Sequence, residues 1–278
     1  MAQRLFFYTT GELVKKDLAS FDWTSGLDVS QIQKNIAAFH EAIKKDGKKP
    51  LEISTKGTVP LGVKLSAFNL KLDGFALECL YQASKVYENG GPYTDLLLVS
   101  SRDAKRDERL RTSGPLVGFR FEGQAFPLQP QTAFYDYVYI CALLENEDLA
   151  NIVLGYDAFT DVEFGTARSL NCQAQAAALF VSLHRLGLTD RLHSFEEFLD
   201  VLQLKRSDDP AGAPQHSAEQ QHTYPEMPLQ PGSCILHKLW GKGRVTAVSS
   251  TVAEIDFPSV GKKKLGLQWI RQNCSPGD

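Results

Sequence analysis

Apolar residues recur at helical spacing in several separate stretches of the chain. Ile32, Ile36, Phe39 and Ile43 lie three or four positions apart, which predicts an amphipathic helix with Ser30 as its N-cap. Further helices are predicted over residues 77–85, from about 132, over about 171–186, and from Ser194, where Glu197 completes a capping box.

Short strands are predicted between these helices. The pattern favours strands over residues 4–22, with a turn at Thr10-Gly11, and strands or loops over 51–76. Residues 114–130 are rich in Gly, Pro and Phe, which predicts a loop or a short hairpin, and the charged run 103–111 predicts a solvated helix. These segments together predict a mainly helical domain with short strands over residues 1–205.

The pattern changes after residue 205. Residues 206–232 contain five of the 13 prolines together with Ser, Gln and Ala, which predicts a flexible linker. From residue 233 to 274, short alternating runs such as 252–257 are separated by glycine turns, which predicts a small SH3/Tudor-like β-barrel. The fold class expected for the whole chain is therefore α+β.

Composition and charge restrict the classes of protein that fit. With 278 residues and 43% hydrophobic content, the chain can bury a core. Five scattered cysteines without metal-ligand spacing predict reduced thiols, and neither a metal site nor a cofactor is expected. The absence of a signal-peptide pattern and of an apolar run as long as a membrane span predicts a cytoplasmic protein with no membrane partner.

Charge divides the chain unevenly. Residues 233–278 hold 7 Lys and Arg against 3 Asp and Glu, although the whole chain has a net charge of −3. A basic module attached to an acidic domain suggests contact with nucleic acid or with an acidic protein. The alternative is an inert module that only aids solubility.

The first candidate for chemistry lies in residues 77–85. Glu78, Gln82 and Lys85 are spaced i, i+4 and i+7, which predicts that they share one helix face. A carboxylate and an amine that face one substrate can perform proton transfer or nucleophilic attack. The alternative is a solvated polar stripe with a spaced charge pair.

A second candidate lies in residues 156–165. This stretch places three acids among aromatic residues and has no helical period, which predicts a loop. Asp161 and Glu163 are candidates for function, because acids on a loop within an apolar segment point to a functional site more strongly than acids on a surface helix do. In the alternative interpretation, Asp157 and Thr160 cap a turn and Asp161 pairs with a buried Arg.

These motifs resemble those of a known family. Residues 65–70 followed by 77–85 are similar to the paired motif of NADAR domains, in which a Ser-x-Phe segment precedes a Glu-x-x-Tyr-Gln-x-x-Lys helix. Residues 159–164 and 169–174 resemble one branch, the antitoxins encoded beside DarT-type toxins that ADP-ribosylate guanine in DNA. The resemblance covers most of residues 4–204. It implies a mainly helical fold and an N-glycosidase that removes ADP-ribose from guanine in DNA or RNA, with a cognate DarT-type toxin as its protein partner.

The resemblance also implies a set of site residues. The catalytic candidates are Glu78, Lys85 and Asp161. The candidates for substrate binding are Asn69, Tyr81, Gln82, Phe159, Thr160, Glu163, Asn171 and Gln173.

Two routes to bond cleavage remain open at this stage. In one, a Lys85 amine of lowered pKa exchanges with the guanine amine to form a Schiff base, and Glu78 moves the protons. In the other, Glu78 or Asp161 activates water, and Lys85 orients Glu78 or holds a diphosphate oxygen.

Two other functions compete with the glycosidase. A non-catalytic antitoxin would bind and block its toxin, and more distant NADAR relatives are linked to hydrolysis of riboflavin-pathway intermediates. The C-terminal 45 residues resemble the Tudor-like barrel of UvrD-type helicases, because His237 begins a His-x-x-x-Gly-x-Gly-x-Val pattern and Phe257 a Phe-Pro-x-x-Gly-x-Lys pattern.

Overall fold

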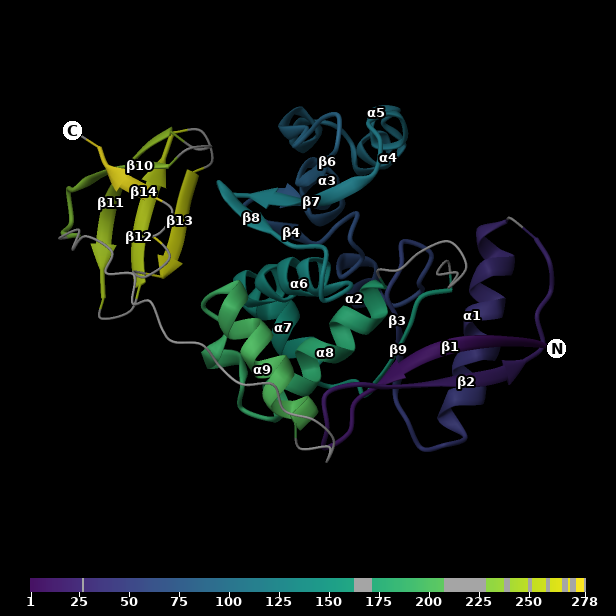
Figure 1. Ribbon diagram of the computed structural model, residues 1–278. Helices are drawn as coiled ribbons and strands as arrows, with labels where there is room; N and C mark the ends of the chain where they lie inside the picture. The colour runs from purple at the N-terminus through teal and green to yellow at the C-terminus, as the bar shows by residue number, and fades with distance from the viewer. Residues whose placement is uncertain are drawn as a thin grey trace. The chain divides into compact units, whose positions relative to one another are not determined.

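The computed structural model divides the chain into two compact units, Met1–Ala211 and Gly212–Asp278, which are described one at a time (Figure 1). Most of the predicted linker, 206–232, lies outside the described residues. The structure describes residues 1–26, 28–162, 172–207, 229–237, 241–249, 252–258, 261–266, 270 and 274–277.

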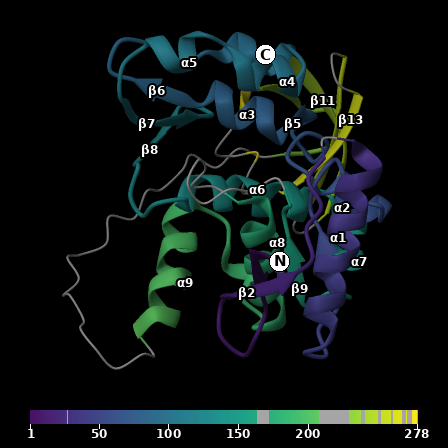
Figure 2. The same ribbon diagram turned by 90° about the vertical axis from the view of Figure 1, so that its right-hand side faces the viewer.

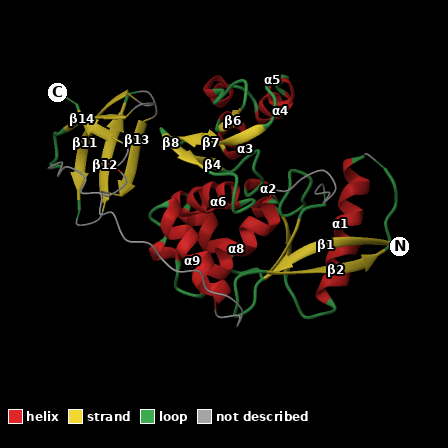
Figure 3. Cartoon of the chain, in the orientation of Figure 1, coloured by secondary structure: helices red, strands yellow, loops and turns green. Residues whose placement is uncertain are grey.

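The first unit contains a mixed four-stranded sheet. Its strands in sheet order are β2 (Lys15–Phe21), β1 (Ala2–Tyr8), β9 (Ala158–Thr160) and β3 (Pro50–Glu52). β1 and β2 form an antiparallel hairpin, shown as the long arrows in Figure 3, which confirms the strands predicted over 4–22. β9 is antiparallel to β1 and parallel to β3, so it lies between them inside the sheet.

Helix α1 (Val29–Lys44) packs against this sheet. Ile36, Phe39 and Ile43 are buried, as their spacing predicts, and the Phe39 ring stacks on Phe21 of β2 with 4.8 Å between centroids. The predicted N-cap was wrong by two residues. The cap is Asp28, whose carboxylate accepts a hydrogen bond from the Ser30 backbone N–H.

Residues 158–160 correct the loop that was predicted over 156–165. They form β9, in which all three side chains are buried. A strand that is buried on both faces of its sheet does not alternate apolar and polar positions. Three residues are also too few to show a period, so the pairing with β1 and β3 could not be predicted from the sequence.

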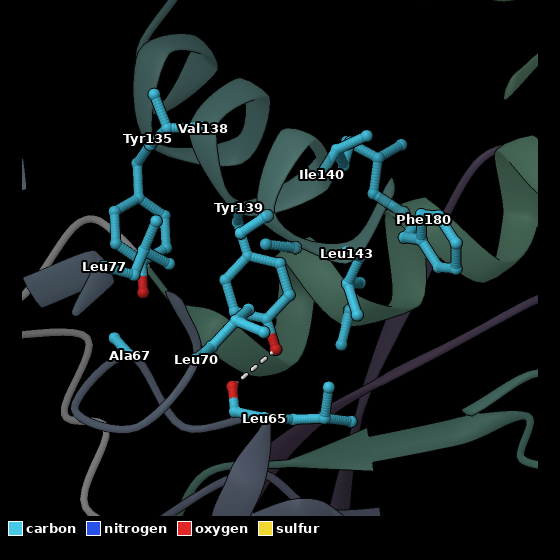
Figure 4. Close-up of a cluster of buried hydrophobic side chains, with 14 of the residues drawn as sticks. Leu65, Ala67, Leu70, Leu77, Tyr135, Val138, Tyr139, Ile140, Leu143 and Phe180 are labelled. Atoms are coloured by element: carbon cyan, nitrogen blue, oxygen red, sulfur yellow. Dashed lines mark hydrogen bonds between the residues drawn. The ribbon is translucent and has the colours of Figure 1, made fainter. Parts of the chain in front are cut away.

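A helical layer carries the main core. Its helices are α6 (Ala133–Glu145), α7 (Glu147–Val153), α8 (Gln173–Arg185) and α9 (Phe195–Ser207). Figure 4 shows Tyr139 of α6 among buried side chains, with its hydroxyl donating to the Leu65 carbonyl at 2.8 Å. The alanines that begin α8 are buried, and α8 packs closely on α6. At the start of α9, the Glu197 N–H donates to Ser194 Oγ, which confirms Ser194 as the cap.

A third group of elements lies on the opposite side of α6 from α8 and α9 (Figures 1 and 2). Its centre is α3 (Leu77–Ala83), beside a sheet with the order β6-β7-β8. The hairpin predicted within 114–130 is confirmed as β7 and β8. The remaining elements of this group are β6 (Lys85–Tyr87), β7 (Leu116–Phe121), β8 (Gln124–Phe126), η1 (Thr94–Leu98), α4 (Ser101–Arg106) and α5 (Arg109–Thr112).

Short elements connect the layers. The charged run 103–111 was predicted as one helix, but it is divided between α4 and α5 at Asp107. The bounds of the other connecting elements are α2 (Pro60–Lys64), β4 (Lys71–Leu72), β5 (Phe75–Ala76) and η2 (Thr189–Arg191).

The second unit is an antiparallel sheet with its own small core. Its order is β13 (Gly261–Gly266), β12 (Val252–Phe257), β11 (Gly241–Val248), β10 (Cys234–His237) and β14 (Cys274–Pro276). Ile235, Val245, Ile255 and Phe257 are buried together. Within the described residues no pairing joins β13 to β14, so the α+β class is confirmed but the predicted closed barrel is not. In the described part of the chain, no helix has both the length and the apolar character needed to cross a membrane.

Candidate functional site

Helix α3 is buried along its whole length, including its polar residues. Glu78 and Gln82 are each only 6% exposed. Gln82 Nε2 donates a hydrogen bond of 2.9 Å to Glu78 Oε1, which confirms that the two side chains share one face. A solvated polar stripe is therefore wrong for this pair, because a buried carboxylate and a buried amide need partners inside the protein.

Lys85 does not lie on this helix. α3 ends at Ala83, and Lys85 is the first residue of β6, paired with Phe119 of β7. The prediction that Lys85 continues the helical face was wrong, because pairing with β7 fixes the chain in an extended conformation from residue 85 onward. Lys85 nevertheless stays at the site, with its Nζ 4.8 Å from the centroid of the Tyr81 ring.

The environment of Lys85 changes its protonation. Burial lowers the pKa of Lys85 to about 8, the charge of Glu78 raises it, and the charge of Lys105 lowers it. An amine with a pKa near 8 is partly uncharged at neutral pH. Only the uncharged amine has the lone pair that a nucleophile needs.

Lys105 is a site residue that the sequence did not predict. It comes from α4, and its Nζ lies 4.0 Å from Glu78 Oε1 and 5.4 Å from the centroid of the Phe68 ring. Its side chain is more than half exposed. Only the packing of α4 on α3 brings it to Glu78, since in the sequence it is one charge within a charged run.

Tyr135 of α6 packs beside Tyr81 of α3. Its ring meets Tyr81 edge to face, with 5.2 Å between centroids. The pKa of Tyr135 is raised well above its usual value, first by burial and then by the acidic groups of Tyr139, Glu78, Cys172 and Asp161. The phenol therefore keeps its proton at neutral pH.

A chain of hydrogen bonds runs from Asp161 to α3. Gln173, the first residue of α8, donates from Nε2 to Asp161 Oδ2 at 3.0 Å and accepts at Oε1 from the Ala67 backbone N–H at 2.8 Å. The Ala67 carbonyl in turn accepts from the Glu78 backbone N–H at 2.8 Å. These hydrogen bonds thus hold Asp161, the start of α8 and the start of α3 together, although they are distant in the sequence.

Other predicted residues occupy different environments. Asn69 is exposed, and its amide donates to the Val63 carbonyl and to Ser66 Oγ, which holds the turn before α3. Phe159 is fully buried in the main core, so no face of its ring is accessible for binding a substrate. Thr160 is also fully buried, and its hydroxyl donates to Glu52.

Six predicted residues are therefore brought together, and two cannot be placed. Glu163 and Asn171 lie outside the described residues. Among the residues that are described, no group of three or more His, Cys, Asp or Glu side chains is arranged to hold a metal ion. Glu78, Tyr81, Gln82 and Lys85 lie together, and Asp161 and Gln173 are joined to them through the backbone of Ala67.

Comparison with known proteins agrees with the motif resemblance. Residues 2–211 match the family described as DarT1-associated NADAR antitoxins. No curated protein matches the sequence. The matched range ends at Ala211, the last residue of the first unit, so it contains every site residue described above and none of the second unit.

Proposed function

Because the chain belongs to the family of DarT1-associated NADAR antitoxins, we propose that its first unit is an N-glycosidase that removes ADP-ribose from guanine bases in nucleic acid. The toxin whose modification it reverses is of the DarT1 type. The single observation that carries this proposal is that a buried carboxylate, Glu78, acts electrostatically on an amine of lowered pKa, Lys85. Such a pair supplies both a proton carrier and a nucleophile.

The bond to be cut joins the anomeric carbon of ribose to the exocyclic amine of guanine. When the sugar ring opens, this bond becomes an imine. The uncharged Lys85 amine adds to the imine carbon, and the guanine amine leaves with a proton that Glu78 delivers. Water then adds to the lysine Schiff base, and breakage of the carbon–nitrogen bond releases ADP-ribose and restores Lys85.

The second route uses the same residues without a covalent intermediate. Glu78 or Asp161 would remove a proton from water as it attacks an oxocarbenium-like anomeric carbon. Charged Lys85 would then only attract the substrate or orient Glu78. The Schiff-base route is favoured here because burial lowers the pKa of Lys85 from 10.5 to about 8, which makes part of the amine uncharged near neutral pH. A residue that served only as a positive charge would not need a lowered pKa.

Gln82 supports a substrate that donates hydrogen bonds. Its Nε2 is committed to Glu78, while its Oε1 is buried and has no hydrogen-bond partner in the described part of the chain. Leaving a buried acceptor unpaired costs about 1–3 kcal/mol. A donor from the ligand would recover this energy, and the N–H groups of guanine are donors of this kind.

The chemical basis of the proposal predicts base selectivity. The protein should release ADP-ribose from guanine-linked substrate and spare thymine-linked substrate, because a ring nitrogen cannot form the neutral imine that an exocyclic amine forms. Release is measured by mass spectrometry on oligonucleotides present at about tenfold molar excess over protein, which requires turnover. Equal rates on both bases would contradict the Schiff-base route. Release limited to one equivalent, or none, would contradict an enzyme and favour an antitoxin that binds its toxin.

The second unit is proposed to assist binding of long nucleic acid. Lys242, Arg244 and Lys262 are exposed on its strands, and cations on a surface add phosphate contacts. A protein truncated after Ala211 should keep its kcat on ADP-ribosyl guanosine and show a higher half-saturating concentration on long modified DNA at low salt. Added salt should reduce the difference between the two proteins, because screening removes the same electrostatic contribution.

A full-length variant provides the matched control for this truncation. Lys242→Gln combined with Lys262→Gln should reproduce part of the effect on long DNA without removing the unit. Unchanged kinetics on DNA at low salt in both proteins would contradict a role in nucleic-acid binding. Loss of activity on the small substrate after truncation would place the second unit within the catalytic machinery.

A further inference from the structure

Glu52 is a buried carboxylate at the end of β3. It is 2% exposed, and both of its oxygens accept hydrogen bonds from residues at the end of β9 and just beyond it. Oε2 accepts from the Thr160 hydroxyl at 2.5 Å, and Oε1 accepts from the Val162 backbone N–H at 2.8 Å. Burying a carboxylate is costly, so a site that satisfies both oxygens in this way requires an explanation.

The sheet register explains how the contact forms. β3 and β9 run parallel, and Glu52 is the register partner of Thr160. Register partners in a parallel pair project to the same face, so the carboxylate meets the Thr160 hydroxyl directly. β9 ends at Thr160, and the longer Glu side chain reaches the Val162 N–H beyond the last strand residue.

The residue enclosed by these two contacts is Asp161. Thr160 and Val162, its neighbours on both sides, donate hydrogen bonds to the Glu52 carboxylate, which fixes the backbone where the chain leaves the sheet. The Asp161 carboxylate itself accepts from Gln173, whose other end holds the Ala67 N–H and so connects to the backbone of Glu78. The position of Asp161 relative to α3 thus depends on contacts made on both sides of it.

We propose that Glu52, together with Thr160 and His40, is a positioning unit that fixes Asp161 for its part in the release of ADP-ribose; this rests on the function proposed above. None of the three is proposed to touch the substrate. Glu52 acts through the side-chain hydroxyl of Thr160 and the backbone N–H of Val162, which lie on either side of Asp161. Thr160, which the sequence predicted as a substrate-binding residue, acts through its hydroxyl.

His40 completes the unit from α1. Its Nε2 lies 2.9 Å from Thr160 Oγ1. The hydroxyl has one proton, which it donates to Glu52, so the ring contributes the N–H in the contact with Thr160. Burial lowers the pKa of His40 to about 4, so the ring is neutral at physiological pH. On the same helix, the charge of Lys44 also lowers this pKa and the charge of Glu41 raises it.

A double-mutant cycle tests whether Thr160 acts through Asp161. Thr160→Val removes the hydroxyl at nearly constant volume and should lower kcat at least about tenfold, as small displacements of reacting groups do. Thr160→Ser keeps the hydroxyl and should retain most of the activity. In an Asp161→Asn background, Thr160→Val should change the residual rate by less than about twofold, since residues that act as a unit are not additive.

Additivity would overturn the inference. An equal loss in both backgrounds would mean that Thr160 only stabilises the fold, and an active Thr160→Val variant would mean that the hydroxyl is not needed. Should Thr160→Val fail to fold, Glu52→Gln serves in its place. Its amide can still accept from the Val162 N–H but presents a donor to Thr160, so it should give the same non-additive pattern with a smaller loss.

A second measurement does not depend on activity. Hydrogen exchange followed by mass spectrometry should show faster exchange of the peptide spanning residues 158–162 in Thr160→Val and Glu52→Gln, and unchanged exchange in Thr160→Ser. Unchanged exchange in all three variants would contradict the proposed positioning unit even if turnover changes. If wild-type protein releases no ADP-ribose, the proposed function fails, while the exchange result still decides whether this unit fixes the segment that carries Asp161.

Discussion

Replacing Glu78 with Gln is expected to lower kcat for the release of ADP-ribose by about 10²–10⁴-fold, the range that general acid–base catalysis contributes. Gln has nearly the same shape as Glu, so it can keep the hydrogen bond to Gln82 within the buried face of α3. It cannot take up or deliver a proton at neutral pH. The loss should therefore appear in kcat, measured as release from a modified oligonucleotide.

Two controls make this result specific. Thermal unfolding of Glu78→Gln should occur close to the wild-type temperature, because no cavity is created and the helix keeps its contacts. Glu108→Gln makes the same chemical change at the exposed N-cap residue of α5 and should leave kcat unaltered. Release by Glu78→Gln near the wild-type rate would remove this carboxylate from the mechanism.

Borohydride added during turnover is expected to attach ADP-ribose covalently to Lys85. Reduction converts the Schiff base to a stable secondary amine, which peptide mapping by mass spectrometry locates. Lys105 is an internal control, because its amine also lies close to Glu78 but is more than half exposed and should remain unmodified. Lys85→Arg keeps the charge but removes the nucleophile, so it should abolish both the adduct and turnover. An absent adduct, together with an active Lys85→Arg protein, would leave Lys85 with a charge role only.

The pH profile offers an independent test of the same residue. Since the pKa of Lys85 is lowered from 10.5 to about 8, kcat/KM should rise with pH as the amine loses its proton, with a midpoint near 8. Lys105→Gln removes a nearby positive charge that lowers this pKa, so the midpoint should move to higher pH. Lys105→Arg keeps the charge and should leave it in place. A profile that is flat across this range would contradict an uncharged Lys85 as the reacting form.

Local patterns in the sequence predicted the elements that depend on local interactions. The spacing of Ile36, Phe39 and Ile43 gave the buried face of α1, and the pairing of Glu78 with Gln82 follows from one helical turn. The hairpin at residues 116–126 also follows from nearby residues. In each case, the partners are close along the chain, so their geometry is set by helix or turn periodicity.

Tertiary contacts decided the remainder of the candidate site. Lys85 begins a strand because β7 pairs with it, and Lys105 reaches Glu78 because α4 packs on α3. Residues 158–160 form a strand because β1 and β3 enclose them, which in turn places Asp161 beside Gln173.

The sequence by itself therefore determined the family motif, the main helices and the polar face of α3. Only the tertiary structure decided which amines surround Glu78 and how Asp161 is held, including the role of Glu52, which no motif indicated. The physical reason is the range of the interactions. Periodicity encodes which face of an element is buried, whereas a strand pairing or a contact between helices joins residues far apart in the chain and leaves no local pattern to detect.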